Sequence, residues 1–384
     1  MDLLLCAEDS EAELCAELES ALPGAAVEWK LPRLVAMDLA LSPGKTVPYL
    51  AFARQFFPEA EAVKATSIRA WATRLFDRIN SCIRQDEPWL LHIAPYYGAP
   101  SSHRIGARAW HTHSRHAQAA RIGGHQPAGP APGAGRQRCQ LIREILLELL
   151  ERKRRGLLRH VQPDVAPFSC TTSLVQLLLT GPEDGFISMA RAPLPFKQRH
   201  VLSPFPLGEL PVAIDKSAPS RAFAKLVEAE ARLGQSIRAG ETCVDLGAAP
   251  GSWTYVAAKR GAWVTAIDRA ELRLDLMRHE RVKVRTGDAL GFVPDGRVDW
   301  MLCDIIAEPE RTAELVVRWV SRGWCRRWVV TLKLREAAGL ETLEWLKKEL
   351  PQWSSELLLT RLCANKKEVC VSGVAKWGLH PACT

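Results

Sequence analysis

Four ionisable residues stand where apolar runs end in the second half of the chain. Asp268, Asp288, Asp304 and Lys333 each lie at or just past such a run. Residues just past the ends of parallel strands converge on one crevice of an α/β sheet. Asp304 and Lys333 are the hardest to explain as ordinary surface charges, because each ends an apolar run and the two opposite charges would meet in the same crevice. Lysine is also rarely a core residue.

Two further charges fit the same crevice. Lys225 lies on the helix predicted before the sheet, and Glu368 opens the last predicted strand. Either residue alone is also explained as a solvated surface charge. Asp268, about 20 residues after a glycine-containing turn, is placed to accept both hydroxyls of a ribose. Asp288 is placed to receive an adenine amino group.

Two lysines with an acid suit a reaction that removes a proton from a poor acid such as an alcohol. Free lysine has a pKa of about 10.4 and is normally charged. Burial and a second nearby cation both lower that pKa, and we expect both at this site. Such a base could deprotonate a ribose 2′-hydroxyl as the oxygen attacks the methyl group of a sulfonium.

The cofactor is suggested by the stretch from Cys243 to Thr254, which predicts a buried strand, a small-residue turn and a helix opening at residue 252 or 253. Gly247 and Gly251 permit a sharp bend and close approach of a ligand to the backbone. The turn lacks the G-x-G-x-x-G dinucleotide pattern, and Pro250 removes an N–H that would face a pyrophosphate. These features favour S-adenosylmethionine over a dinucleotide as the cofactor. An ordinary strand–turn–helix that binds no ligand is the remaining alternative.

The elements around these residues alternate between helix and strand. This alternation predicts an α/β fold with a mostly parallel, Rossmann-like sheet and an antiparallel edge. Strands are expected near 243–246, 263–267, 282–285, 298–303 and 327–332, with a final hairpin over 356–363 and 368–374. Helices are expected near 220–233 (with Ser220 as N-cap), 252–260, 270–278, 309–321 and 340–350.

The first half predicts an α+β region. Strands are expected at 3–6, 34–41, 89–94, 174–179 and 186–189, and helices at 11–22, 67–84 and 141–150. Residues 98–137 read as a low-complexity basic insert; the histidines at 111, 113 and 116 have no Cys or acidic ligand nearby, so no metal is expected. Prolines 193–211 punctuate a domain boundary, giving units 1–45, 46–195 and 196–384.

Composition limits the partners. A net charge of +8 and a pI near 9.0 permit a nucleic-acid partner. Arg152, Lys153, Arg154 and Arg155 form a run that suits phosphate contact, although cations also suit a helix C-terminus. The 11 cysteines lack a C-x-x-C pair. With no signal peptide and no apolar run of roughly 18 residues, we expect a cytoplasmic protein without a membrane segment.

The second half resembles the FtsJ-like ribose 2′-O-methyltransferases, most closely the RlmM type that modifies 23S ribosomal RNA. The matching stretches, within about residues 200–375, are 220–226, 244–254, 301–304, 323–325, 332–334 and 367–369. The resemblance implies a catalytic tetrad of Lys225, Asp304, Lys333 and Glu368, with Lys333 as general base. It implies S-adenosylmethionine on Gly247, Ala249, Pro250, Gly251, Ser252, Trp253, Asp268, Asp288 and Asp304.

The same resemblance implies a small ferredoxin-like unit and a THUMP-like RNA-capture region in the first half, where Phe52-Ala-Arg-Gln55 and Arg152–Arg155 match that layout. The expected partner is large-subunit ribosomal RNA, with a cytidine as target, and the favoured oligomeric state is a monomer.

Other classes of function stay open. One is a non-catalytic RNA-binding protein that retains the fold. Another is a base methyltransferase, which usually carries an Asn/Asp-Pro-Pro-aromatic motif or a catalytic cysteine, unlike Asp304-Ile-Ile-Ala307. Cys303 and Cys325 are interpreted as packing residues. A dinucleotide oxidoreductase is least favoured.

Overall fold

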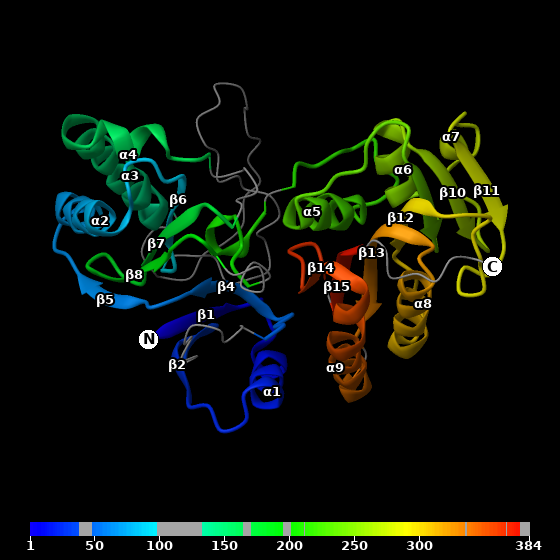
Figure 1. The fold of residues 1–384 in the computed structure, drawn as a ribbon, viewed down its shortest axis with the longest axis horizontal. Helices are drawn as coiled ribbons and strands as arrows, with labels where there is room; N and C mark the ends of the chain where they lie inside the picture. The colour runs from blue at the N-terminus through cyan, green and yellow to red at the C-terminus, as the bar shows by residue number, and fades with distance from the viewer. Residues whose placement is uncertain are drawn as a thin grey trace. The chain divides into compact units, whose positions relative to one another are not determined.

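The structure is a computed structural model that describes residues 1–37, 48–97, 133–163, 170–194, 201–210, 212–334, 336–365 and 367–376. The chain divides into two compact units, whose main division falls after Pro211 (Figure 1). That point lies in the proline-punctuated segment where the sequence predicts a domain boundary. The two units are described separately below.

The second unit is built on one seven-stranded sheet with the order β11-β10-β9-β12-β13-β15-β14. Strands β11 to β13 pair in parallel, and β15 runs antiparallel to both of its neighbours. The strand order reverses between β9 and β12, which is where ligands bind in sheets of this kind. The strands are β9 (Thr242–Leu246), β10 (Trp263–Asp268), β11 (Val282–Thr286), β12 (Val298–Cys303), β13 (Cys325–Lys333), β14 (Ser354–Thr360) and β15 (Glu368–Ala375).

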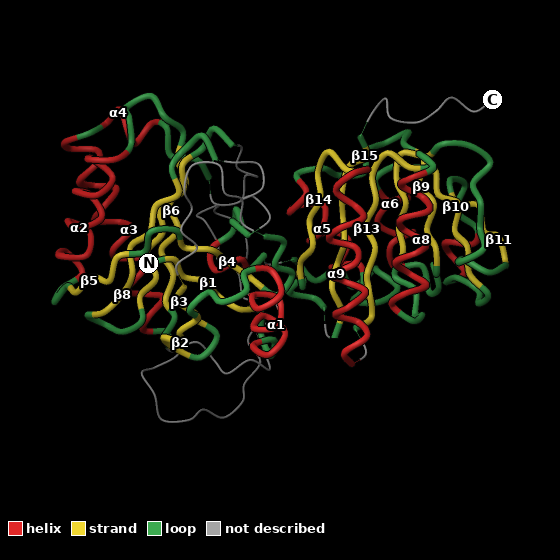
Figure 2. Tube along the Cα trace, turned by 60° about the horizontal axis from the view of Figure 1, so that its bottom comes forward, coloured by secondary structure: helices red, strands yellow, loops and turns green. Residues whose placement is uncertain are grey.

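Helices lie on both faces of this sheet (Figures 1 and 2). One buried cluster joins Leu226 and Trp253 to Trp300 and Val329 of the central strands. The predicted Rossmann-like, mostly parallel sheet is confirmed; its antiparallel strand is β15, and β14 forms the edge. The helices are α5 (Phe223–Leu233), α6 (Ser252–Lys259), α7 (Leu274–Met277), α8 (Pro309–Ser321) and α9 (Glu336–Trp353).

Two helix starts differ from the prediction. Helix α5 begins at Phe223 rather than Ser220, and Ala222 holds the cap position. Helix α7 is a single turn instead of the expected 270–278. The backbone N–H of Arg273 donates to the carbonyl of Pro250 (3.1 Å). Because that N–H is committed to the glycine turn, the helix starts only after Arg273.

The first unit contains two four-stranded sheets, as expected of an α+β region. One has the order β2-β3-β1-β4 and the other β5-β8-β7-β6. In chain order the elements before residue 211 are β1 (Asp2–Cys6), α1 (Glu11–Ala21), β2 (Val27–Leu31), β3 (Leu34–Met37), β4 (Ala53–Phe57), β5 (Glu61–Lys64), α2 (Ile68–Cys82), β6 (Trp89–Pro95), α3 (Ala134–Lys153), α4 (Arg155–Arg159), β7 (Ser173–Leu179), β8 (Asp184–Ala190) and the 3-10 turn η2 (Pro206–Gly208). Residues 12–17 of α1 group with the second unit.

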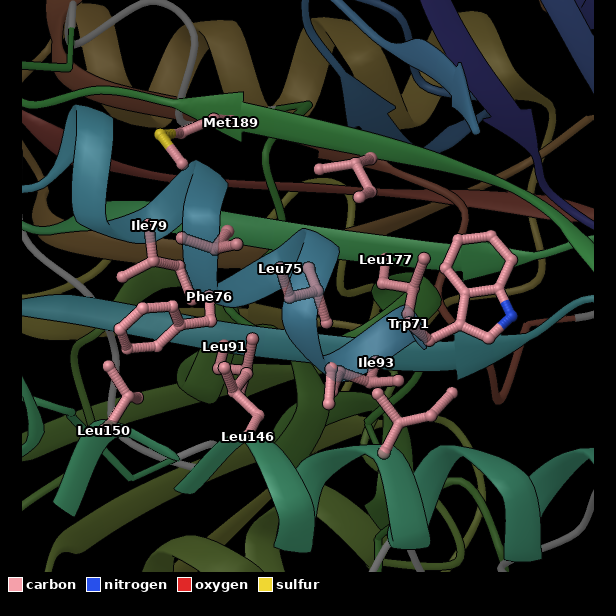
Figure 3. Close-up of a cluster of buried hydrophobic side chains, with 14 of the residues drawn as sticks. Trp71, Leu75, Phe76, Ile79, Leu91, Ile93, Leu146, Leu150, Leu177 and Met189 are labelled. Carbon is pink, nitrogen blue, oxygen red and sulfur yellow. The ribbon is translucent and has the colours of Figure 1, made fainter. Parts of the chain in front are cut away.

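The core of the first unit follows the period of its strands. Leu177 and Leu179 join a cluster formed with helices α2 and α3 (Figure 3), whereas Leu178 joins the cluster around Leu3 and Leu5 of β1. Alternate residues of a strand point to opposite faces. Strand β7 therefore supplies side chains to two cores at once.

Two predicted limits in the first half need correction. Strand β4 pairs with β1, so the first sheet extends beyond the predicted unit 1–45. Helix α3 begins at Ala134, inside the stretch 98–137 that reads as an insert, because Cys139 and Ile142 bury one of its faces. Residues 98–132, with the histidines at 111, 113 and 116, lie outside the described residues, as do residues 38–41 of a predicted strand.

Candidate active site

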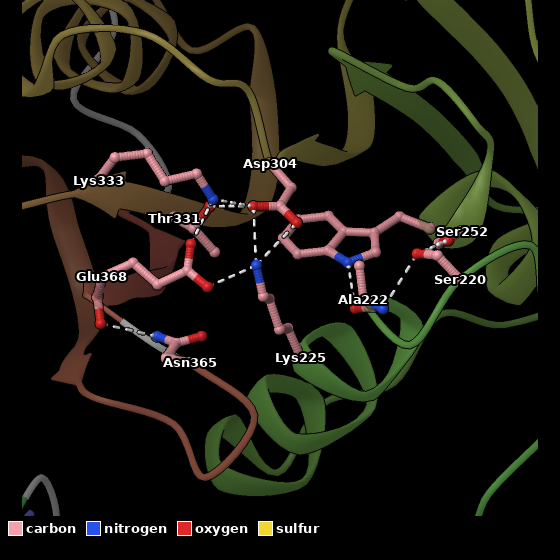
Figure 4. A network of polar contacts seen from close by, with 10 residues as sticks. Ser220, Ala222, Lys225, Ser252, Asp304, Thr331, Lys333, Asn365 and Glu368 are labelled. Atoms are coloured by element: carbon pink, nitrogen blue, oxygen red, sulfur yellow. Dashed lines mark hydrogen bonds and ion pairs between the residues drawn. The ribbon is translucent and has the colours of Figure 1, made fainter.

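Four side chains of the second unit meet at the carboxyl end of the parallel strands (Figure 4). Asp304 follows β12 directly, and Lys333 is the last residue of β13. Glu368 is the first residue of β15 and lies opposite Lys333 in the antiparallel register. Lys225 reaches the same point from helix α5. The sheet thus brings together the four residues of the predicted tetrad.

The four charges alternate around a ring. Lys225 Nζ lies 3.1 Å from Asp304 Oδ2 and 2.5 Å from Glu368 Oε1. Lys333 Nζ lies 2.5 Å from Asp304 Oδ1 and also contacts Glu368 Oε2. The most exposed of these side chains, that of Lys333, is 17% exposed. Two cations facing two carboxylates leave this buried ring close to neutral, which offsets the cost of burying each charge.

Thr331, which was not among the residues predicted from the sequence, completes the ring. Its hydroxyl contacts Asp304 Oδ1, and Lys333 Nζ donates to it across 3.1 Å. Thr331 and Lys333 are two residues apart on β13, so their side chains share a face. That spacing from the lysine is a signal that the sequence offers for the threonine.

The lysine pKa expected from the sequence is wrong for the ring as it stands. Burial lowers the pKa of Lys333, but the charge of Asp304 and hydrogen bonds to Asp304 and Glu368 outweigh burial and raise it. Burial raises the pKa of Asp304, and the charges of Lys333 and Lys225 lower it to a net value below its usual range. Lys333 therefore rests as an ammonium group.

The glycine turn between β9 and α6 is shaped by residues without side chains. Gly247 has φ of 75° and Gly251 has φ of 106°, values that favour glycine. A Cβ on Gly251 would lie 2.3 Å from Leu276 Cδ1, and one on Gly247 would lie 3.0 Å from Ile305 Cβ. The peptide bond between Ala249 and Pro250 is cis. Leu276 and Ile305 thus pack closely against the two glycines, and the turn presents backbone without side chains at these positions.

Asp268 is tied to this turn, whereas Asp288 is not. One oxygen of Asp268 accepts from the backbone N–H of Ala249 (2.9 Å) and the other from that of Ala270 (2.8 Å). Asp288 is exposed and pairs with Arg269 at 3.2 Å. The structure therefore joins Asp268 to the predicted cofactor turn and leaves Asp288 in a solvent-exposed ion pair.

Ser252 and Trp253 connect the turn to helix α5. The Ser252 and Ser220 hydroxyls are 2.7 Å apart, and Trp253 Nε1 donates to the Ala222 carbonyl (2.9 Å). The Trp253 side chain is buried in the core. Its indole thus holds the start of the helix that carries Lys225.

Asp245 is a second residue that the sequence analysis missed. It is buried within β9 and accepts from the Thr254 hydroxyl (2.6 Å). Burial raises its pKa to about 7; the Thr254 hydrogen bond opposes this rise, while nearby Asp304 and Asp268 add to it. The sequence signal for Asp245 is its position as the one charged residue within the buried strand β9. A nearby cation would favour the ionised carboxylate.

Glu228 fixes the segment that leads to Glu368. It is fully buried one turn beyond Lys225 on α5, and its carboxylate accepts from the backbone N–H of Cys363 (2.8 Å) and from Arg232 (2.6 Å). Asn365 then donates to the Glu368 carbonyl (3.1 Å). One helix thereby supplies Lys225 and anchors the turn before β15.

Replacing Glu228 with glutamine is expected to lower kcat about tenfold, equivalent to about 1.4 kcal/mol in the barrier. The amide keeps the size but loses the charge that balances half-buried Arg232, so the turn before Glu368 loosens. The rate of the catalysed reaction and the melting temperature would measure the two effects, with exposed Glu341→Gln as control. A lower melting temperature with unchanged kcat would show that Glu228 only stabilises the fold.

The cationic run of the first unit is exposed. Arg152 and Lys153 end helix α3, and Arg155 begins helix α4. Arg154 Nε donates to Asn80 Oδ1 at 2.5 Å, and Lys153 Nζ lies 5.5 Å from the centroid of the Phe76 ring. These local contacts orient the run without neutralising its charge.

Cys303 and Cys325 are poor nucleophiles. Both are fully buried, and burial raises the pKa of each thiol to about 12. A thiolate is the reactive form. Within the described ranges no group of three or more His, Cys, Asp or Glu side chains could hold a metal ion. Nor does any helix in the described part of the chain have the length and apolar character to cross a membrane.

Residues 218–322 match the model of the FtsJ-like methyltransferase family. The match contains the glycine turn, Lys225 and Asp304, and the strand order extends the same unit to Lys333 and Glu368. Over these residues the second unit is similar to the FtsJ-like methyltransferases, the resemblance that the sequence predicts.

The relatives add a more particular likeness. Over 165 residues the chain is 40% identical to the ribosomal RNA large subunit methyltransferase M of Thauera aminoaromatica, covering 41% of this chain and 45% of that protein. The namesake from Edwardsiella ictaluri is 34% identical over 196 residues, covering 47% and 51%. The chain thus spans about half the length of the curated relatives it matches.

The similarity to solved structures is slight. The fibrillarin pre-rRNA processing protein of Methanococcus jannaschii aligns with 52% of this chain and 82% of that chain, at 15% identity and a TM-score of 0.30. A likeness of this size carries no argument about function.

Proposed function

We propose that this chain catalyses S-adenosylmethionine-dependent 2′-O-methylation of a ribose in 23S large-subunit ribosomal RNA, with a cytidine as the target nucleotide. The observation that carries the proposal is the buried Lys225–Asp304–Lys333–Glu368 ring at the carboxyl ends of β12 and β13. A ring of this kind suits the transfer of a proton from an alcohol, and it lies in an FtsJ-like domain.

The residues around the glycine turn fit S-adenosylmethionine. When bound, this cofactor supplies an electrophilic methyl group on a sulfonium. Gly247 and Gly251 give close backbone approach, and Asp268 is held against the turn. The other proposed contacts are Ala249, Pro250, Ser252, Trp253, Asp288 and Asp304.

Lys333 acts as the general base in this proposal. It must be neutral when the hydroxyl proton moves, although the ring holds it charged at rest. When the substrate hydroxyl donates a hydrogen bond to one carboxylate oxygen of the ring, that oxygen stabilises the ammonium form of Lys333 less strongly. Burial and the adjacent cation Lys225 then favour the neutral amine. Asp304 and Glu368 keep the amine aimed at the hydroxyl, and Lys225 balances their charge.

The proposed partner is ribosomal RNA, and the relatives' names support that choice. The net charge of +8 suits a polyanionic substrate. We assign RNA capture to a THUMP-like region within residues 46–195, with phosphate contacts from Arg152, Lys153, Arg154 and Arg155. The reaction is placed in the cytoplasm, with a monomer as the active form and without a metal ion.

Transfer of label from S-adenosylmethionine to total ribosomal RNA that lacks its native ribose methylations tests the function. We expect the labelled linkage to resist alkali, because a 2′-O-methyl group blocks cleavage by the neighbouring hydroxyl. Alkali-labile label on a base would make the chain a base methyltransferase. RNA binding without transfer, on naked and particle-bound RNA, would leave a non-catalytic RNA-binding protein.

A further inference from the structure

A second surface of the methyltransferase unit is shaped for a polyanion. Strand β11 lies at the edge of the sheet, and no helix occurs between it and β12 in Figure 1. The connecting residues leave a groove of about 440 Å³ over the starts of β9, β10 and β11. In most parallel sheets a crossover helix covers such a face.

Cationic side chains at and beside β11 line this groove. Arg281, directly before the strand, and Lys283 and Arg285 within it alternate with Val282 and Val284. Val282 and Val284 pack against the apolar cluster beside α7. With the side-chain period of two, the three cations line the groove.

Aromatic rings lie among these cations. Trp263, at the start of β10, is 53% exposed, and the Arg281 guanidinium lies 5.6 Å from its ring centroid. The Arg285 guanidinium lies 5.8 Å from the centroid of Phe292. An exposed indole beside a guanidinium offers a nucleobase a stacking platform and its phosphate a charge.

The cations outnumber the acids of the groove. Glu280 lies 3.4 Å from Arg281 and Asp295 lies 2.8 Å from Arg285, and both acids are more than three-quarters exposed. Lys283 is exposed and has no ion-pair partner among the residues that the structure describes. The groove therefore keeps a positive charge that is free to meet an anion.

We propose that this groove, formed by β10, β11 and the connection to β12, binds a single-stranded segment of the RNA substrate. Lys283 and Arg281 contact phosphates, and one base stacks on Trp263. The inference rests on the proposed function for the identity of the RNA. An acidic protein segment would use the cations but has no need of the exposed indole, so RNA is the occupant that the surface favours.

The position of the groove predicts the reach of the substrate. The ring of charges lies at the carboxyl end of the strands, and Trp263 begins β10, which has 6 residues. At a rise of ~3.3 Å per residue that separates the two places by about 20 Å. The ring also lies two to three strands away from β10 in the sheet, so an RNA must extend several nucleotides from its target to reach both places.

Binding of a dye-labelled oligoadenylate of about 12 nucleotides tests the groove directly. Lys283→Glu and Trp263→Ala are each expected to weaken Kd about tenfold, with Lys348→Glu on α9 as the charge-reversal control. The salt slope should fall in Lys283→Glu. Unchanged Kd in both variants would overturn the proposal, as would weaker binding of polyglutamate with unchanged binding of oligoadenylate.

Methyl transfer separates this inference from the proposed function. With ribosomal RNA the two groove variants should raise KM and leave kcat unchanged. With a substrate too short to reach the groove, the wild type and the variants should have equal KM. If no RNA is methylated by any form, the proposed function fails while the oligoadenylate measurement still decides whether the groove binds RNA. Higher KM on both long and short substrates would contradict the groove.

Discussion

Replacing Lys333 with alanine is expected to reduce the rate of methyl transfer by about a thousandfold while leaving cofactor affinity within about twofold. General-base catalysis contributes about 10²–10⁴ to a rate. Lys333 Nζ contacts both carboxylates of the ring, and its neighbour Lys225 contacts the same two. Single-turnover label transfer measures the chemical step, and equilibrium dialysis measures cofactor binding.

The same reaction should speed up with pH. Because Asp304 and Glu368 raise the pKa of Lys333, the neutral amine is scarce at pH 7, and its fraction rises about tenfold per pH unit below that pKa. A raised folded-state pKa also means that the ion pairing stabilises the fold at lower pH and is lost as pH rises through the folded pKa. The rates of methyl transfer at different pH values are therefore compared only below the folded-state pKa of Lys333.

The control for this prediction is Lys348→Ala, a change at an exposed lysine of α9. It removes one cation from the unit without touching the ring. A Lys333→Ala rate within tenfold of the wild type, with the same rise with pH, would place the base at another residue.

The largest expected effect on stability comes from Gly373→Ala. Gly373 lies in β15, between β13 and β14. A Cβ there would lie 2.3 Å from Trp328 Cζ2 and 2.5 Å from the Glu356 carbonyl oxygen. Trp328 is fully buried and the carbonyl belongs to the backbone, so neither can yield cheaply. We expect a loss of about 3 kcal/mol in unfolding free energy.

A loss of that size lowers the melting temperature of a unit of this length by about 6–12 °C. Calorimetry of the whole chain would measure it. Gly296→Ala is the matched control, because a Cβ at that glycine would meet nothing within 4 Å. Equal melting temperatures for the two variants would mean that Trp328 moves aside without cost.

Strand ends were predictable because apolar runs mark them. Asp304 and Lys333 stand out in the sequence since each interrupts a run suited to burial, and the parallel sheet brings their strand ends together. Glu368 required the extra inference that the last strand is antiparallel. The register of Lys333 opposite Glu368 bears that inference out.

Buried polar partners were not predictable in the same way. The sequence signals for Thr331 and Asp245 do not identify their partners, and Glu228 lies on an ordinary helix. The importance of all three residues arises from contacts with residues outside their own strand or helix. The predicted direction of the Lys333 pKa shift was wrong for a related reason. Two lysines in the sequence suggest mutual repulsion, but in the structure each lysine faces two carboxylates and attraction prevails.

The first half shows where local patterns mislead. Helix α3 starts among Gly, Arg and Gln residues that resemble the insert before them, because its turns are fixed by burial of Cys139 and Ile142 further along. Strand β4 follows a break in the pattern, yet it pairs with the first strand of the chain. Pairing partners so distant in sequence leave no local periodicity to read.

The antiparallel placement of β15 also sets an order of events during synthesis. Lys225, Asp304 and Lys333 leave the ribosome before α9 and β14, and Glu368 leaves after them. The sheet can form from β9 to β13 while the ring still lacks one carboxylate. A nascent chain therefore acquires the fourth charge of the ring, and its balanced geometry, only when β15 inserts between β13 and β14, which have already been made.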